Sequence, residues 1–236
     1  MLVLGALGGA AVLLRPLERH VRDSVPTSMV RPDQFSGLAG RGSLLAVLGG
    51  LRSVVAGGFW LKTNLAWERS DESATLELIE LTVAADERPL YFWLNGARMI
   101  AYDMPEWGAD AAARPEAVRR KIGREHAERA LALLEKGLRW HGPRVELYVE
   151  MANIQLRRLG NAEEAARCYR LAAELPDAPY YAARIYAELL VGLGREAEAL
   201  AWLERQLVTL PANDPAARRE VVVERIHSLK VRVGEK

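Results

Sequence analysis

Three alanines recur at a nearly fixed interval in the second half of this 236-residue chain. Ala130, Ala165 and Ala199 lie 35 and 34 residues apart, and each is followed four residues later by a large apolar residue. These large residues are Leu134, Tyr169 and Leu203. A small residue on one helix lets a neighbouring helix approach closely, and a large residue one turn later fills the space between them. Self-similarity with a period of about 20–50 residues is typical of stacked repeats, so the spacing predicts repeated pairs of packed helices.

Glycine and proline mark the boundaries of these units. Gly160 and Gly194 stand just before the second helix of a pair, where a turn is needed. Prolines that would stop a helix stand near the unit ends. They are Pro143, Pro176 and Pro211. Three helix–loop–helix units are therefore expected in the second half of the chain.

Composition supports a helical body and excludes several classes of protein. The chain holds 36 Ala and 35 Leu, and 50% of its residues are hydrophobic, so an all-β fold or global disorder is not expected. The net charge of +1 argues against a protein built mainly to bind nucleic acid. A single cysteine, Cys168, excludes an internal disulfide framework and a cysteine-rich zinc site.

The segments GNAEEAARCYRLAAELP (160–176) and GREAEALAWLERQLVTLP (194–211) resemble the second-helix half of the tetratricopeptide repeat family. The resemblance covers about residues 124–215. It implies an all-α, tetratricopeptide-like helix–turn–helix solenoid of about four repeats, with a C-terminal capping helix. Such a stack normally needs at least about three repeats to be stable.

The upstream repeats are degenerate. Residues 59–66 and 71–85 would form one helix pair, and residues 91–102 would open a second. An insertion at 103–123 departs from the family pattern and could hold a short extra helix at 115–122. With this insertion, the predicted solenoid spans residues 43–213.

Residues 214–236 are expected to form the capping helix, which starts at Asp214-Pro215. Its apolar residues would face the last repeat. These are Val222, Val223, Ile226 and Leu229. Arg219, Glu224 and Arg225 would face water. A polar outer face is what the open end of a solenoid requires.

The N-terminus has a different character. Residues 1–14 are apolar and uncharged, and a basic linker follows at 15–42. A helix of 14 residues is about 21 Å long, short for a membrane span, so this segment is either an anchor, a signal-like or truncated span, or a buried helix. The basic flank favours a membrane-anchored protein with a cytoplasmic body, with a periplasmic body as the alternative. The apolar stretch 44–61 carries Arg52 and is expected to be a buried or interface-facing helix rather than a second span.

Motifs for catalysis are scarce. The chain has no Gly-rich phosphate loop, HExxH or GxSxG motif. The histidines His20, His126, His141 and His227 lack ligand spacing and are interpreted as surface or loop residues. Cys168 is interpreted as structural. The acidic residues Asp103, Glu106 and Asp110 are interpreted as turn and cap residues. No catalytic residue, metal or cofactor is therefore expected.

The resemblance also implies a groove for partner peptides, lined by the first helix of each repeat. Its expected residues are Trp60, Asn64, Trp67, Tyr91, Asn95, Arg98, Tyr102, Glu150, Arg157, Tyr181 and Arg184. Asn64 and Asn95 match two asparagines of the subclass that clamps a C-terminal carboxylate. Trp60, Leu147 and Met151 replace the basic residues of that clamp, which disfavours this mode of binding.

These patterns predict a non-enzymatic scaffold that is tethered to a membrane and binds a partner protein through its groove. An alternative is an accessory or assembly factor of a bacterial envelope secretion, export or pilus system. A third hypothesis, of a different class, is an enzyme with its site in the 103–123 insertion, formed by Asp103, Glu106 and Arg98. Nucleic-acid binding is a fourth, disfavoured because arginines and glutamates alternate on the second helices.

Overall fold

The computed structural model describes residues 38–234, and within them nine α-helices are present and no β-strand. The all-helical expectation is therefore confirmed. The helices are α2 (Leu38–Glu68), α3 (Glu72–Ala85), α4 (Leu90–Arg98), α5 (Glu116–His141), α6 (Val145–Arg157), α7 (Ala162–Ala173), α8 (Tyr180–Gly192), α9 (Glu196–Thr209) and α10 (Arg219–Gly234). The chain divides into two compact units, residues 1–51 and 52–236. In the first unit the structure describes only the beginning of α2.

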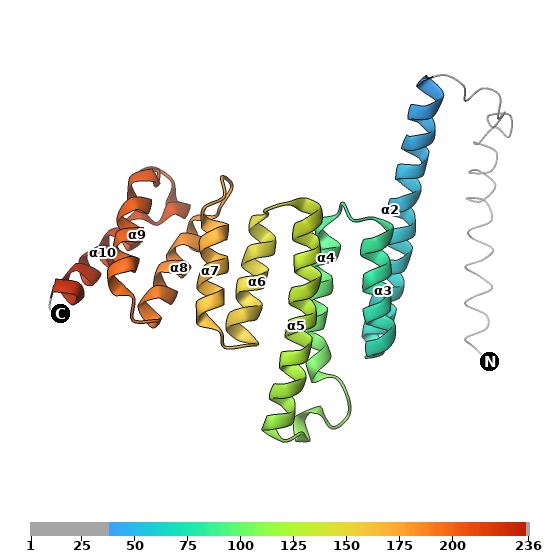
Figure 1. Ribbon diagram of the computed structural model, residues 1–236, viewed down its shortest axis with the longest axis horizontal. Helices are drawn as coiled ribbons and strands as arrows, with labels where there is room; N and C mark the ends of the chain where they lie inside the picture. Colours follow the sequence, from blue (N-terminus) through green and yellow to red (C-terminus); the bar gives the residue numbers. More distant parts are fainter. Residues whose placement is uncertain (1–37, 235–236) are drawn as a thin grey trace. The chain divides into compact units, whose positions relative to one another are not determined.

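Within residues 52–236, successive helices lie side by side in the order of the sequence (Figure 1). From α4 to α10, each helix contacts the next along the chain. The connections are short between α5 and α9, and longer from α4 to α5 and from α9 to α10. Gly160 and Gly194 have φ angles of 65° and 75°, a region that favours glycine. Both glycines stand at the turns that the sequence predicts.

Side chains and prolines fix several helix starts. The Asp71 carboxylate accepts a hydrogen bond from the Ala74 amide at 3.1 Å, and the Asn161 side chain accepts one from the Glu164 amide at 3.1 Å. Each side chain satisfies an amide that has no partner inside the helix. Pro89 and Pro179 directly precede α4 and α8. The helix boundaries therefore follow from local sequence.

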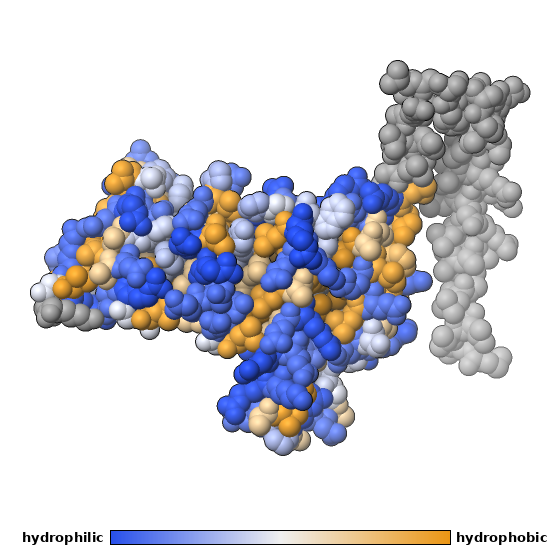
Figure 2. Space-filling view, in the orientation of Figure 1, coloured by the Kyte–Doolittle hydropathy of each residue, from blue (hydrophilic) through white to orange (hydrophobic). Residues whose placement is uncertain are grey.

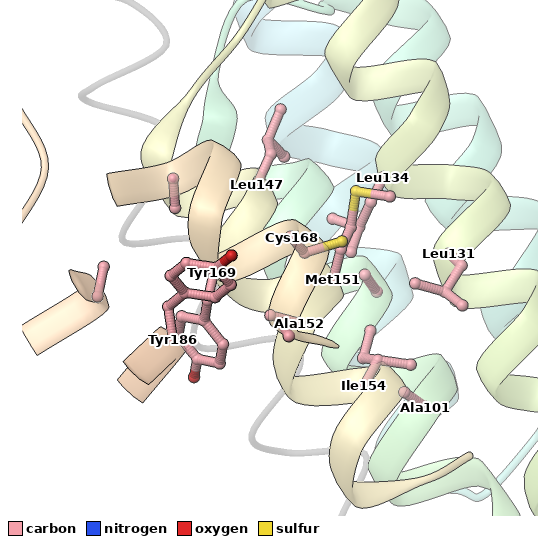
Figure 3. Close-up of a cluster of buried hydrophobic side chains, with 14 of the residues drawn as sticks. Ala101, Leu131, Leu134, Leu147, Met151, Ala152, Ile154, Cys168, Tyr169 and Tyr186 are labelled. Carbon is pink, nitrogen blue, oxygen red and sulfur yellow. The ribbon is translucent and has the colours of Figure 1, made fainter. Parts of the chain in front are cut away.

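The residues at the recurring positions are buried, and Figure 3 shows two of the large ones, Leu134 and Tyr169, in a cluster of buried hydrophobic side chains. Ala130, Ala165 and Ala199 are all 0% exposed. The large residues that follow them are buried as well, namely Leu134, Tyr169 and Leu203. Cys168 lies in the same cluster, and burial raises the pKa of its thiol. The recurring residues are therefore buried, as their predicted packing role requires, and Cys168 is buried with them.

The helix α2 differs from the expectation in length. It begins at Leu38, inside the predicted linker, and joins the expected helix 59–66 to the apolar stretch before it. Val54 is 70% exposed and Leu61 is 68% exposed, whereas Ala56 and Trp60 are buried, so the stretch is buried on one side only and the interface-facing alternative stays a prediction. Among the described residues, no helix is both long and apolar enough to cross a membrane. The proposed anchor at 1–14 lies outside the described residues.

The insertion also differs from the expectation. A separate helix at 115–122 is not formed, because α5 runs without a break from Glu116 to His141. Gly123 does not interrupt the helix, since it lies buried beneath Arg158, whose Nη2 would be 3.5 Å from a Cβ at this position. Before α5, the chain forms a π-helical turn and two short 3₁₀ turns.

The C-terminal helix starts later than predicted. Asp214 and Pro215 begin a 3₁₀ turn, and Arg218 adopts a left-handed conformation with φ of 45° before α10. Val223 is 48% exposed, which corrects its predicted burial. Arg219 does not face water as predicted, because its Nη1 donates to the Leu207 carbonyl at the end of α9. Val222, Ile226 and Leu229 are buried, as expected.

A buried carboxylate connects α2 to the loop between α3 and α4. Asp86 is 1% exposed. It accepts hydrogen bonds from Arg88 Nε at 2.7 Å and from Ser53 Oγ at 2.7 Å. The Arg88 guanidinium holds the pKa of the Asp86 carboxyl well below its usual range. The neighbouring Glu87 pairs with Arg52 of α2, with the nearest atoms 3.3 Å apart. The charge of Arg52 is thereby neutralised in an otherwise apolar stretch.

Candidate functional site

A hollow of about 590 Å³ lies among α4, α6, the loop before α6 and the loop before α8. We refer to it as the α6 hollow. It is lined by Leu94, Arg98, Pro143, Arg144, Val145, Glu146, Val149, Glu150, Asn153, Leu175, Pro176, Asp177, Pro179 and Tyr181. Its volume lies within the range of about 300–1,000 Å³ that is usual for ligand sites. Charged and apolar side chains both line the hollow, and three prolines stiffen its loops.

A partly buried ion pair crosses from α4 to α6 at this hollow. Arg98 Nε and Nη2 lie 2.8 Å and 2.7 Å from Oε2 of Glu150. The Glu150 side chain is 5% exposed, whereas that of Arg98 is 51% exposed. The pair therefore presents its guanidinium to solvent and keeps its carboxylate inside. It fixes two side chains of adjacent repeats at the wall of the hollow.

Tyr181 and Asn153 supply the neutral polar groups of the hollow. Tyr181 is the second residue of α8 and is 43% exposed. The Asn153 side-chain oxygen accepts a hydrogen bond from Tyr169 Oη at 2.9 Å, so α7 orients this amide. Burial raises the pKa of the Tyr169 phenol further above neutral pH. The hollow thus combines an accessible aromatic ring with an oriented amide.

The structure brings together only part of the predicted groove. Arg98, Glu150 and Tyr181 line the α6 hollow. Asn64 and Asn95 instead donate their amide groups to the carbonyls of Trp60 and Tyr91, four residues earlier on their own helices, at 2.9 Å each. Their hydrogen bonds within α2 and α4 give no sign of an arrangement for clamping a carboxylate.

Two of the predicted groove tryptophans are engaged with the chain itself. Trp60 is 8% exposed, so it belongs to the core and not to a groove surface. Its ring lies edge-on to Tyr91 at 5.4 Å between centroids, and 5.3 Å from Phe92. Trp67 is 36% exposed, and its Nε1 donates to Asp103 Oδ2 at 2.8 Å. The aromatic run on α4 therefore docks this helix against α2.

The remaining predicted residues are distributed over the molecule. Tyr102 is half-buried beneath Arg158, whose Cζ is 5.9 Å from the ring centroid. Burial raises the pKa of the Tyr102 phenol to about 12. Arg157 lines a different pocket, on the other end of α6. Arg184 Nη1 donates to the Ala217 carbonyl at 3.0 Å and so holds the turn before α10.

Several lining residues of the hollow are not among the predicted groove residues. They are Leu94, Pro143, Arg144, Val145, Glu146, Val149, Asn153, Leu175, Pro176, Asp177 and Pro179. Many of them lie in the loops before α6 and α8 or in the first turn of α6. The prolines at 143, 176 and 179 are the sequence signal that could have indicated these two loops as part of the site, since prolines in loops mark rigid connections.

The candidates for catalysis and metal binding are dispersed. Asp103 accepts a hydrogen bond from Trp67, whereas Glu106 and Asp110 are exposed. Within the described residues, no three His, Cys, Asp or Glu side chains are placed to hold a metal ion. His126 is buried, not on the surface as predicted. Its Nε2 lies 3.2 Å from Glu72 Oε1 of α3, which explains its burial as a bridge between helices.

Comparison with known proteins does not assign this chain to a family. No protein-family model matches it, and no curated protein matches it either.

Proposed function

We propose that this protein is a non-enzymatic scaffold, a tetratricopeptide-like helical solenoid that binds a partner protein through the α6 hollow. The consecutive packing of α4 to α10 and the burial of small residues at a period of 34 to 35 support the solenoid. Since one fold serves many functions, the binding role has to rest on the site itself.

The observation that carries this proposal is the α6 hollow. It joins residues of three successive first helices, α4, α6 and α8, in one depression of about 590 Å³. In a stack of helix pairs, a depression across several repeats offers an extended surface for a partner segment. The accessible Tyr181 ring and the charged Arg98 are residue types enriched at binding hot spots.

The chemistry of the hollow favours a peptide or helix with apolar anchors and a polar flank. Leu94 and Val149 are half-buried and provide apolar lining, whereas Arg144 and Glu146 are exposed and carry opposite charges. Amphipathic segments bind such grooves through a few side chains spaced along one face. We further propose that residues 1–14 tether the scaffold to a membrane, because they are uniformly apolar and a basic segment follows them.

Two doubly substituted variants, one in the hollow and one outside it, test the role of the hollow. The first is Arg144→Glu combined with Tyr181→Ala, both in the hollow. The control is Arg139→Glu combined with Val208→Ala, at two exposed positions outside it. The hollow variant should capture at least about tenfold less partner from solubilised native membranes than the wild-type chain, because hot-spot truncations cost more than 1.4 kcal/mol.

The control variant should capture the same partner as the wild type, and both variants should keep wild-type helicity by circular dichroism. Equal capture by the hollow variant and the wild type would contradict the proposal.

A further inference from the structure

A second pocket, of about 420 Å³, lies at the opposite end of α6 and is lined by five arginines. We refer to it as the arginine pocket. The arginines are Arg119, Arg120, Arg124, Arg157 and Arg158, and the other lining residues are Glu106, Glu116, Gly123 and Leu159. The first half of α5 forms one wall and extends beyond the neighbouring helices (Figure 1), where Figure 2 shows mainly hydrophilic residues. The pocket shares no lining residue with the α6 hollow.

The charges in this pocket do not balance. Five guanidinium groups face two carboxylates, an excess of three positive charges. Glu116 is engaged by Arg120 at 3.1 Å, and Glu106 lies 3.8 Å from Arg158 with a side chain that is 67% exposed. Among the described residues, no carboxylate lies within ion-pair distance of Arg119, Arg124 or Arg157. Three strong cations therefore line the pocket without an acidic partner.

Arg158 is held in place and has an unused donor. Its side chain is 23% exposed, packs over Gly123 and stacks on Tyr102. Its Nε is buried and has no hydrogen-bond partner in the described part of the chain. A buried donor without a partner is uncommon in folded proteins, and it marks Arg158 as a side chain whose hydrogen-bonding capacity the described part of the chain does not use in full.

Helix electrostatics explain only part of this cluster. Arg157 and Arg158 stand at the C-terminal end of α6, where cations compensate the partial negative charge of the helix. In α5, which begins at Glu116, Arg119 and Arg120 lie near the N-terminal end, where the helix favours anions and disfavours cations, whereas Arg124 lies about two turns further from that end. The position of Arg119 and Arg120 is therefore unfavourable by itself, and an anion in the pocket would offset it.

We propose that the arginine pocket binds a phosphate-bearing anion, either soluble or in a lipid headgroup. Guanidinium groups form paired hydrogen bonds to phosphate oxygens and stay charged at all physiological pH values. The pocket volume suits one or two phosphate groups with a small substituent. This site is separate from the proposed partner site, so either proposal can fail without the other.

The test compares two doubly substituted full-length chains. Arg124→Gln with Arg157→Gln removes two of the three cations without an acidic partner. Arg139→Gln with Arg170→Gln removes the same charge from exposed positions outside the pocket. Isothermal titration calorimetry with inorganic tripolyphosphate should show binding to the wild type that weakens with added salt. Affinity should fall at least about tenfold in the pocket variant and less than about twofold in the control. Because glutamine is a good helix former, both should keep wild-type helicity, and the single variant Arg124→Gln should show an intermediate loss.

Vesicles distinguish the two sources of phosphate. Flotation with phosphatidylglycerol vesicles, relative to phosphatidylcholine vesicles, measures a preference for anionic headgroups. A preference that the pocket variant loses and the control keeps would identify a lipid headgroup, whereas tripolyphosphate binding without this preference would identify a soluble anion. The proposal is overturned if the wild type shows neither effect, or if the pocket variant binds as the wild type does.

Discussion

Replacing Trp93 by alanine is expected to lower the free energy of unfolding by about 3–5 kcal/mol. Trp93 is 2% exposed, and its Nε1 donates to the Glu87 carbonyl at 2.9 Å. Its ring covers Gly137 of α5, where a Cβ would lie 3.4 Å from the Trp93 Cδ2 atom. The substitution removes a large apolar surface from the α4–α5 contact and leaves the Glu87 carbonyl without this donor. Urea denaturation of the full chain, followed by circular dichroism, measures the loss.

Trp140→Ala is the matched control, because it removes the same side chain from a position that is 64% exposed. Its effect should be within about 0.5 kcal/mol, as is usual for surface substitutions. Similar losses for the two variants would show that Trp93 does not have the packing role described above.

Replacing Gly96 by leucine should lower the free energy of unfolding by at least about 2 kcal/mol, since overpacking strains a dense core. Gly96 lies in α4, between α3 and α5. A Cβ at this position would be 2.8 Å from Ile79 Cγ2 and 3.3 Å from Leu133 Cδ2. The first distance is too short for real atoms, and the rest of the leucine side chain adds to the clash. Urea denaturation again gives the measurement.

Gly192→Leu provides the matched control on α8. A Cβ at Gly192 would have no heavy atom outside its helix within 4 Å, and leucine has the higher helix propensity. Its stability should equal or slightly exceed that of the wild type. Equal free energies of unfolding for Gly96→Leu and Gly192→Leu would contradict the close packing of α3 and α5 against α4 at Gly96.

The helix pairs were largely predictable because their boundaries and contacts are encoded locally. Asp71 and Asn161 cap helices, glycines at 160 and 194 make the turns, and the alanines at 130, 165 and 199 recur where helices approach closely. Each of these signals either involves residues close together in the sequence or recurs at a constant period. They therefore remain readable without knowledge of the tertiary structure.

The composition of the α6 hollow was only partly predictable, for a physical reason. A repeat frame places residues on one face of a helix, but hydrogen bonds decide whether a side chain reaches the surface. The side chains of Asn64 and Asn95 are hydrogen-bonded to carbonyls of their own helices, and Trp60 packs in the core against the aromatic residues of α4. The loop residues Arg144 and Asp177 join the hollow through tertiary packing alone.

The arginine pocket illustrates the same limit. Residues 119–124 and 157–158 are far apart in the sequence, and within each stretch the arginines read as a solvated helix face. Only the unbroken continuation of α5 past its neighbours brings the two groups together. The insertion, interpreted from sequence as a loop with a separate helix, supplies that continuation.

The most direct test of the central claim is site-specific photo-crosslinking in native membranes. A photoreactive phenylalanine analogue replaces either Tyr181, in the α6 hollow, or Val208, which is 84% exposed on α9 outside it. Crosslinking from position 181 is predicted to give one discrete protein adduct, which disappears when Arg144→Glu is added, and position 208 is predicted to give none. Binding of a partner protein at the α6 hollow would be contradicted if position 181 gave no adduct, or if both positions gave the same adduct.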